Sequence, residues 1–415
     1  MNILFKGVVF AIGAISIQAI TLKQLITHTL QYNQNIKADS YTKMAKQKSY
    51  ESQKNIFNPN ITIGASYNQL SMDLRDTQIG KTQSAFVKLG LNLYDGGKSI
   101  ALKKQKLYEY TAQKYQNITN IKETILNLIT MYFNLKTINE DIKVYKEKAK
   151  ALKAQYERVK TKYNEHMTTI DEVLKLKSEY ESNSYTIAQL KYQKEELQKN
   201  IELLSGIKIT TFDTKTLPSI NLKYKPTSDI KALEETLKAQ QENINITKSS
   251  KKPQIKLENT TTWYKYDDYN HMLLKDLPNK QNQFILSLSY NLFDTSSKSK
   301  IESSKLSKLA IADKLAYLKH KSYTEFQLAK KKLQIQKLKL KSLKSAVDMA
   351  NSVYDIIKQK YENGVVDNIT YLDALSKKIY NLALYKQALN DLEIAKANYY
   401  FKSGVDYRQM LKDWQ

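Results

Sequence analysis

The chain has 415 residues, no cysteine and a formal net charge of +25. The lack of cysteine excludes disulfide frameworks and thiolate metal sites, and the four histidines lie too far apart in sequence to predict a zinc site. Only three of the 66 basic residues are arginine, the side chain that suits bases and phosphates best. We therefore interpret the charge as solvated lysines on helix faces and expect no nucleic-acid partner; a basic surface for another partner is the less favoured alternative.

The N-terminal segment has the pattern of a secretory signal peptide. Lys6 precedes an apolar run over 7–17, and small residues follow near Ala19. This run is shorter than the ~20 residues that a transmembrane helix needs, so we expect a signal peptide over residues 1–19. Export in this way argues against a cytoplasmic nucleotide enzyme. No later stretch is apolar for long enough to predict a membrane-spanning helix.

One unit occurs twice in the chain. The stretch "YERVKTKYNEHMTTIDEVLKLKSEY" begins at Tyr156, and the similar stretch "YDIIKQKYENGVVDNITYLDALSKKIY" begins at Tyr354. We predict a first repeat over 20–207, made of a helix, two strands and a long helix pair, and a second repeat over 229–415. The segment 208–228 contains prolines and lacks helical periodicity, which predicts a linker.

Each repeat has two segments of about ten residues in which apolar and polar or small residues alternate, as transmembrane β-barrel strands do. The alternating residues of the clearer segments are Ala85, Val87, Leu89, Leu91 and Leu93, then Phe284, Leu286, Leu288, Tyr290 and Leu292. An ordinary half-buried sheet is the alternative. Four strands cannot close a barrel, for which about eight are needed, and lipid does not tolerate open sheet edges. The sequence therefore predicts an oligomer, with eight strands in a dimer or twelve in a trimer.

Apolar residues at steps of three and four predict very long helices. In the first repeat they run from Ile118 to Tyr163 and continue in a returning helix from Val173 to Leu204. This spacing is typical of a coiled-coil seam. A helix from near Gly97 to Tyr163 would be roughly 100 Å long at about 1.5 Å per residue. No compact soluble domain needs a helix of this length, so we expect the protein to reach between two places that are far apart.

The junction Asp95-Gly96-Gly97-Lys98-Ser99 looks like half of a phosphate-binding loop. The full motif needs a glycine where this chain has Asn92, inside the strand. The matching junction of the second repeat keeps Asp294 but has no glycine. We therefore interpret both as strand-to-helix joints, with Gly96 and Gly97 allowing a change of direction. We expect no enzyme and no cofactor.

Together these features resemble the TolC family of outer-membrane efflux proteins. The resemblance covers nearly all of the mature chain, and the repeat, the "LYDGGK" joint and the tail that begins "YENGVVDNITYLDALSKKIY" carry it most specifically. It implies a mainly α-helical homotrimer with a 12-stranded transmembrane β-barrel in the outer membrane of a Gram-negative bacterium and a coiled-coil tunnel in the periplasm. It also implies the exit duct of a tripartite efflux pump or a type I secretion system, with a periplasmic adaptor and an inner-membrane RND- or ABC-type transporter as partners.

The resemblance places a gate at the turns between the paired long helices. By position, Asp373 keeps one acidic residue of the second repeat and Thr370 replaces the other, while Glu172 takes the acidic position of the first repeat. Tyr361 keeps a tyrosine of the turn. The arginine that locks the closed state in some members corresponds to Val366.

Three further residues belong to this predicted gate. Gly364 suits a helix-ending turn, whereas His166 stands at the matching position of the first repeat. Asp171 and Asp367 adjoin helix N-termini, where the macrodipole favours negative charge, so a capping role is their alternative. Three copies of Asp373 around a narrow axis would repel one another and attract cations.

A periplasmic or surface coiled-coil protein, either an adaptor or a structural protein, is the main alternative to a channel. Long helices and a signal peptide fit that alternative. Two pairs of barrel-like strands inserted between helices do not fit it, so we favour a passive channel.

Overall fold

A computed structural model describes residues 21–55, 59–70, 77–209, 211–212, 216–218 and 221–409. The predicted signal peptide lies outside the described residues, as do six residues of the connection between the first two strands. The chain forms two compact units, which we call the helical unit and the sheet unit. The helical unit comprises residues 1–38, 118–227 and 321–415, and the sheet unit comprises residues 39–117 and 228–320.

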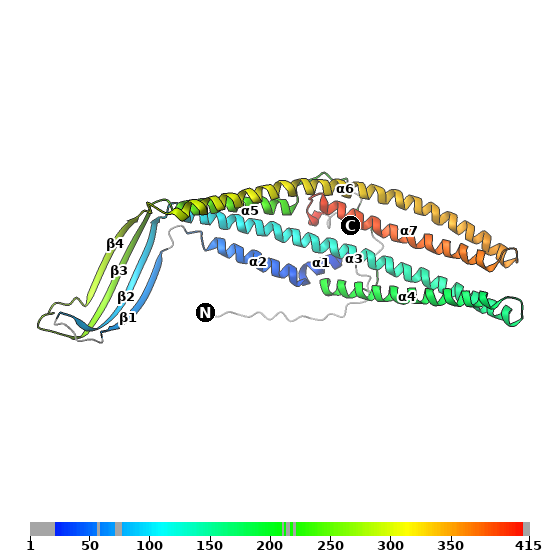
Figure 1. Ribbon diagram of the computed structural model, residues 1–415, viewed down its shortest axis with the longest axis horizontal. Helices are drawn as coiled ribbons and strands as arrows, with labels where there is room; N and C mark the ends of the chain where they lie inside the picture. Colours follow the sequence, from blue (N-terminus) through cyan, green and yellow to red (C-terminus); the bar gives the residue numbers. More distant parts are fainter. Residues whose placement is uncertain are drawn as a thin grey trace. The chain divides into compact units, whose positions relative to one another are not determined.

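The sheet unit contains one antiparallel sheet and four helical segments (Figure 1). Its strands, paired in chain order, are β1 (Asn60–Gln69), β2 (Ile79–Tyr94), β3 (Gln254–Tyr269) and β4 (Lys280–Ser289). Its helical segments are most of α2 (Gln34–Glu51), the start of α3 (Lys98–Asn164), α5 (Ser228–Ser249) and the start of α6 (Thr295–Glu362).

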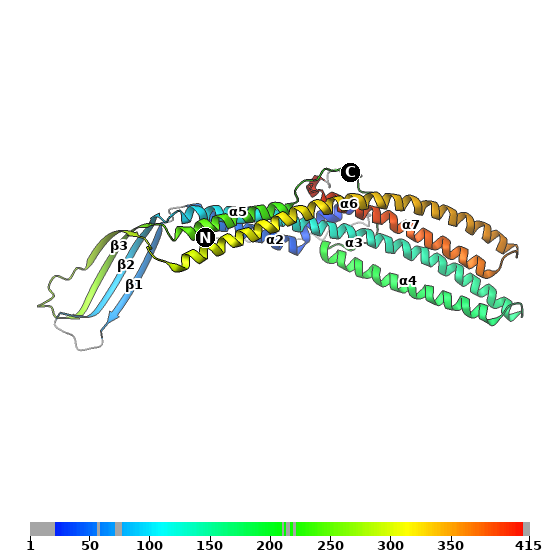
Figure 2. The ribbon, with the colours of Figure 1, turned by 45° about the horizontal axis from the view of Figure 1, so that its top comes forward.

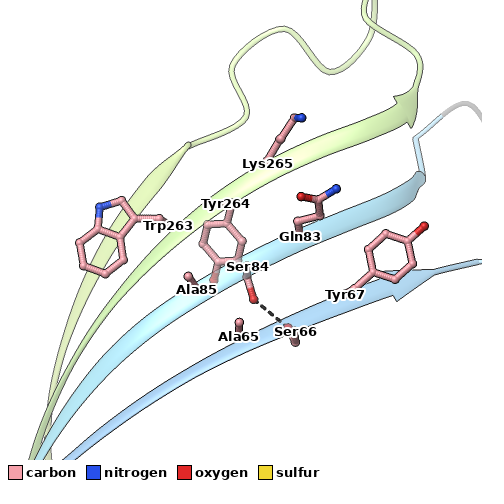
Figure 3. Close-up of a pocket in the computed structure, with 9 residues that line it drawn as sticks. All are labelled: Ala65, Ser66, Tyr67, Gln83, Ser84, Ala85, Trp263, Tyr264 and Lys265. Atoms are coloured by element: carbon pink, nitrogen blue, oxygen red, sulfur yellow. Dashed lines mark hydrogen bonds between the residues drawn. The ribbon is translucent and has the colours of Figure 1, made fainter.

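The pairing register separates the side chains of the sheet into two chemically different faces, because directly paired residues point the same way. On the face that we call the apolar face, Ile63 pairs with Val87, and Leu257 pairs with Leu286. The opposite, polar face carries the ion pair between Lys88 Nζ and Glu258 Oε2 at 2.9 Å. Figure 3 shows the same alternation near the loops, where neighbouring residues of each strand point to opposite sides.

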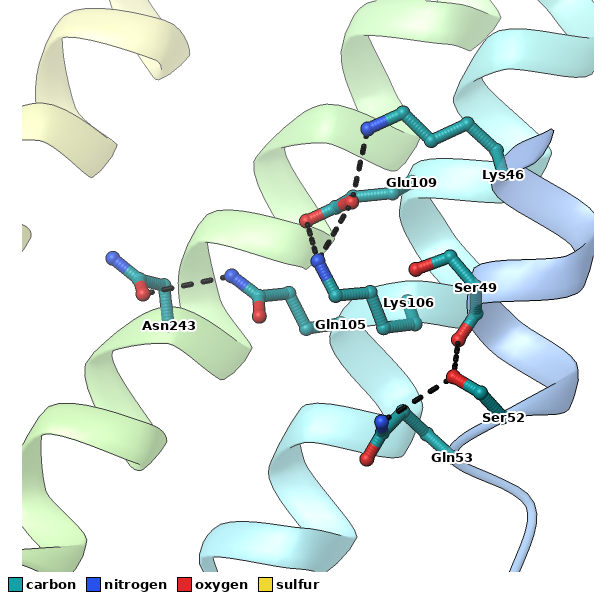
Figure 4. A network of polar contacts seen from close by, with 8 residues as sticks. All are labelled: Lys46, Ser49, Ser52, Gln53, Gln105, Lys106, Glu109 and Asn243. Atoms are coloured by element: carbon teal, nitrogen blue, oxygen red, sulfur yellow. Dashed lines mark hydrogen bonds and ion pairs between the residues drawn. The ribbon is translucent and has the colours of Figure 1, made fainter. Parts of the chain in front are cut away.

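Polar contacts order the helical segments of the sheet unit as α2, α3, α5 and α6. Lys46 on α2 lies 3.2 Å from Glu109 on α3, and Gln105 on α3 donates to Asn243 on α5 (Figure 4). On α5, Glu234 accepts from Lys319 of α6 at 2.7 Å. The outer strands of the sheet, β1 and β4, each pair with one neighbouring strand, and α2 and α6 stand at the two ends of the row of helices.

The helical unit contains α1 (Leu22–Tyr32), α4 (Ile170–Ser205), α7 (Asn368–Lys402) and the remaining parts of α3 and α6. None of the described helices is long and apolar enough to cross a membrane. The order across the unit is α4, α3, α7 and α6 (Figure 2). Its main core cluster is built chiefly from apolar side chains of α1, α3, α4 and α7. The largest fully buried members of this cluster are Leu25, Ile26, Ile125, Leu128, Ile129, Tyr132, Phe133, Leu135, Ile201 and Ile209.

The described part of the predicted linker lies along α7 and hydrogen-bonds to it. The Leu217 amide donates to the buried Glu393 carboxylate at 2.6 Å. The Tyr399 hydroxyl accepts from the Leu222 amide and donates to the carbonyl of the same residue. The Lys225 amide donates to the Ser403 carbonyl at 2.8 Å. These bonds satisfy backbone groups that would otherwise be buried without partners.

The expectation of a mainly helical fold with four antiparallel strands is confirmed. The order of elements also repeats: α2, β1, β2, α3 and α4 are followed by α5, β3, β4, α6 and α7. Strand pairs form because each alternating segment can bury backbone polar groups only by pairing, and the long helices form because their apolar stripes recur at helical spacing.

We predict that Gly404→Ala destabilises the helical unit far more than Gly364→Ala. Both glycines have left-handed backbone, with φ of +78° and +72°, which costs an alanine on the order of 1–3 kcal/mol. Only at Gly404 would the new Cβ also meet another atom, the Lys225 carbonyl oxygen, at 2.0 Å. Thermal unfolding of the two purified variants measures the difference. Equal losses of stability would show that the contact between the linker and α7 is unimportant.

Candidate functional site

The two helical hairpins of the helical unit end in the same kind of turn. In the α3–α4 turn the Met167 amide donates to the Lys162 carbonyl, and in the α6–α7 turn the Val365 amide donates to the Lys360 carbonyl, both at 2.8 Å. This bond, five residues back, is the mark of a Schellman turn, whose preceding residue is left-handed. Gly364 takes that position in the second hairpin, and His166 takes it in the first with φ of +60°. Histidine therefore does not change the turn.

The predicted acidic residues of the first hairpin stand in the first turn of α4 and accept hydrogen bonds from the two threonines just before it. The Thr168 hydroxyl donates to the Glu172 carboxylate at 2.8 Å. A hydrogen bond from the Thr169 side chain lowers the pKa of the exposed Asp171. Both carboxylates lie in the first helical turn, where the macrodipole also favours them.

Asp367 caps α7, and Thr370 is its partner. The Asp367 carboxylate accepts from the Thr370 amide at 2.8 Å, and the hydrogen bond from the Thr370 side chain is the largest cause of its lowered pKa. Asp373 is exposed one turn further on, where its carboxylate accepts from Lys377 Nζ at 2.7 Å. Val366 is half-buried in the turn itself. The predicted residues of this hairpin thus lie together, but two of them serve the helix start.

A buried glutamine, which the sequence pattern did not indicate, connects α3 to the second hairpin. Gln155 is 6% exposed, and its amide nitrogen donates to the Tyr361 hydroxyl and to the Asn368 side-chain oxygen. Tyr361 is near the end of α6 and Asn368 begins α7. One side chain of α3 therefore holds both arms of the α6–α7 hairpin.

Aromatic rings surround this contact. The Tyr361 ring stacks on the Tyr371 ring at a centroid distance of 4.8 Å, and the Arg158 guanidinium lies 5.7 Å from the Tyr361 centroid. The Tyr371 and Tyr354 hydroxyl oxygens are 3.3 Å apart. Burial, followed by this hydrogen bond, raises the pKa of Tyr371 well above its usual value. We call Gln155, Tyr354, Tyr361, Asn368 and Tyr371 the hairpin lock; it contains no acidic residue, lysine or arginine.

The two strand-to-helix joints use aspartate in the same way but differ in backbone. Asp95 accepts from the Ser99 amide at 2.8 Å, and Asp294 accepts from the amides and hydroxyls of two serines. The hydrogen bonds from Ser297 and then Ser296 lower the pKa of Asp294 to about 2.

Glycine is needed only at the first of these joints. Gly96 and Gly97 have φ of +69° and +86°. A Cβ on Gly96 would also lie 2.7 Å from the Ser249 carbonyl oxygen, so this joint packs against the end of α5. The described residues contain no group of three or more His, Cys, Asp or Glu side chains that could hold a metal ion.

Comparisons with known proteins agree with this architecture. Residues 25–206 match the family model described as outer membrane efflux protein, and no curated protein sequence gives a significant match. The structure of CusC is similar with a TM-score of 0.82 and 15% identity, covering 92% of this chain and 92% of that chain. The CmeC outer membrane channel of Campylobacter jejuni has a TM-score of 0.79 and 15% identity, covering 100% and 98%.

The outer membrane protein VceC of Vibrio cholerae has a TM-score of 0.77 at 13% identity, with coverage of 93% and 96%. At such identities these matches show a shared fold, and they extend it over both repeats. The family resemblance seen in the sequence is confirmed by the match of the first repeat. Residues 25–206 thus match the outer membrane efflux protein family, and the second repeat completes the fold that these solved structures share.

Proposed function

We propose that the protein is the outer-membrane channel of a tripartite efflux pump and conducts substrates passively as a homotrimer. One observation carries this proposal: the sheet has an exposed apolar face, a polar opposite face and two open edges. Ile63 on the apolar face is 77% exposed and Leu288 is 71% exposed in the single chain. An apolar outside and a polar inside are what a water-filled barrel in lipid requires.

Association of three copies accounts both for the unpaired edge strands of the sheet and for the exposed apolar side chains of the outer helices. Twelve strands would close the sheet, since β4 of one copy could pair with β1 of the next. The edge helices also expose apolar side chains that a neighbouring copy would cover. On α4 these are Leu174, Tyr185, Tyr192 and Leu203, and on α6 they are Leu328, Ile335, Leu338, Met349, Val353 and Ile356.

The proposal implies partners that supply energy and open the channel. A periplasmic adaptor would contact the hairpins, and an inner-membrane transporter of RND or ABC type would drive substrate into the duct. We infer that the hairpin lock favours the closed state and that adaptor binding shifts the population toward an open one. The lock requires α3 and the α6–α7 hairpin to stay together, so separating them would break its hydrogen bonds.

We predict that Ile63→Lys prevents membrane insertion, whereas Thr62→Lys is tolerated. The two residues are adjacent on β1 and point to opposite faces. A lysine on the lipid-facing side costs about 2–4 kcal/mol near the bilayer centre, and one that faces water costs little. Outer-membrane fractionation with heat-modifiable trimer bands measures the outcome. Equal insertion of both variants would contradict the proposed channel.

Gln155→Ala should weaken the closed state and raise the open probability. The substitution removes two hydrogen bonds from a buried site and leaves the Tyr361 hydroxyl and the Asn368 side chain with one partner fewer. Single-channel recording in planar bilayers measures the effect. Lys143→Ala is the control, since Lys143 is an exposed residue of the same helix and bonds only to Glu140 among its described contacts. An unchanged open probability would mean that the lock does not hold the gate.

Asp373→Ala should reduce cation selectivity, and Lys377→Ala should increase it. The ion pair between these exposed side chains offsets the negative charge that Asp373 contributes. Removing the lysine leaves three unpaired carboxylates in a trimer, which attract cations more strongly. Reversal potentials in a salt gradient report the selectivity. If both variants behave as the wild type, Asp373 lies away from the conducting path.

A further inference from the structure

Three lysines on the apolar face of the sheet form a slanted line near the two loops that join the strands. They are Lys81 on β2, Lys265 on β3 and Lys280 on β4. Lys81 pairs with Asp267, which is two residues beyond Lys265, and Lys280 pairs with Trp263, which is two residues before it. The line therefore steps by two residues at each strand, always in the same direction.

On the two edge strands the apolar residues of this face end along a parallel slant, at Tyr67 on β1 and Phe284 on β4. On the two inner strands Ile79 and Tyr269 stand beyond the lysines, next to the loops. Through the paired strands Phe284 is in register with Ile61, which is six residues from Tyr67. Six residues over three strand steps is again two residues per strand. The line of lysines thus runs parallel to the slant that the edge strands define.

A tilted barrel brings such a slanted line to one depth in the membrane. Strands of membrane barrels tilt by about 35–45° from the axis. With strands about 4.8 Å apart and a rise of about 3.3 Å per residue, a level line shifts by roughly 3–5 Å from one strand to the next, which is about 1 to 1.5 residues. Since side chains alternate between faces, a step of two is the nearest that stays on the outer face. The lysines would form a level girdle just beyond the apolar band.

Two of these lysines keep their charge available. Lys265 has no acidic partner within the described residues, and neither has Lys280, whose Nζ lies 6.0 Å from the Trp263 ring centroid. Lys81, in contrast, lies 3.8 Å from the Asp268 carboxylate. The helices of the sheet unit leave the sheet at the ends away from the loops (Figure 1). If those helices are periplasmic, the girdle lies at the outer leaflet.

We propose that Lys265 and Lys280, with Trp263 beside them, bind the phosphate groups of anionic lipids in the outer leaflet. This inference rests on the proposed function, because it takes the apolar face to lie in lipid. Lysine binds phosphate as a point charge, and indole rings favour the membrane interface. Below the lysines, Asn282 donates to the Thr261 hydroxyl at 2.7 Å, so polar side chains of this border are already satisfied without lipid.

Binding of bis-phosphorylated lipid A to the purified trimer in detergent tests the proposal. Native mass spectrometry compares the wild type with the double variant Lys265→Gln/Lys280→Gln. Each lysine near an anionic headgroup strengthens binding about fivefold, so the double variant should bind roughly 25-fold more weakly. Lys256→Gln is the matched control, since Lys256 is on β3 but on the polar face, and its affinity should equal that of the wild type.

Two further ligands distinguish binding of the lipid phosphate from binding of free phosphate. Dephosphorylated lipid A should bind as weakly to the wild type as the intact lipid binds to the double variant, and inorganic phosphate alone should not compete at millimolar concentration. If the glutamine variants fail to form trimers, Lys265→Arg/Lys280→Arg and a salt titration of the wild type replace them. The arginine variant should keep its affinity, and added salt should reduce it.

Several outcomes would overturn the inference. They are equal binding by the wild type and the double variant, an equal loss in Lys256→Gln, affinity that is independent of salt, and equal binding of the dephosphorylated lipid. Single-channel conductance of the same trimer is recorded in parallel. A conducting trimer without phosphate-dependent binding rejects the lysine girdle alone, whereas a wild type that neither inserts nor conducts rejects the proposed function.

Discussion

The unpaired backbone at the two edges of the sheet is the constraint on which the rest of the structure depends. Each of β1 and β4 has a neighbour on one side only, so its outward N–H and C=O groups need partners from elsewhere. Water can supply them to a soluble sheet, but lipid cannot. Because this sheet also exposes an apolar face that suits lipid, its edges need their partners from protein. Association with further copies then satisfies the backbone, and lipid covers the apolar side chains.

The same open arrangement continues in the helices. In each unit the helices follow one another in a row whose outer members expose side chains that have no neighbour in the single chain. In the helical unit α4 and α6 take this position, and exposed residues such as Leu203 and Leu338 mark it. A chain that is incomplete in both its strands and its helices is best understood as one sector of a ring. Stability of the single chain therefore cannot be separated from assembly.

The hairpin lock combines one buried and four half-buried side chains that are polar and uncharged in type. The acids Asp171 and Asp367 hydrogen-bond to threonines at helix starts. Gln155 and the stacked tyrosines instead make the contact between α3 and the second hairpin. Neutral hydrogen bonds avoid the desolvation cost of buried charges. Such a lock also depends little on salt, since screening acts on charges.

Sequence alone determined the elements of this protein and their repetition. Alternation with period two predicted the strands, and recurrence at steps of three and four predicted helices as long as α3, because these periods follow directly from backbone geometry. Asp95 and Asp294 could be recognised as equivalent from their repeated context, although one joint has glycines and the other has none. Even the need for further copies followed from counting strands.

Tertiary structure alone decided which side chains meet. Gln155 adjoins the apolar seam in sequence, and nothing in the helical period shows that it reaches both Tyr361 and Asn368. The alignment of Lys81, Lys265 and Lys280 likewise depends on strand register, which a single sequence does not state for strands far apart in the chain. Local periodicity fixes the direction of a side chain relative to its own helix or strand. Its partners depend on how distant segments pack, and that is a property of the whole fold.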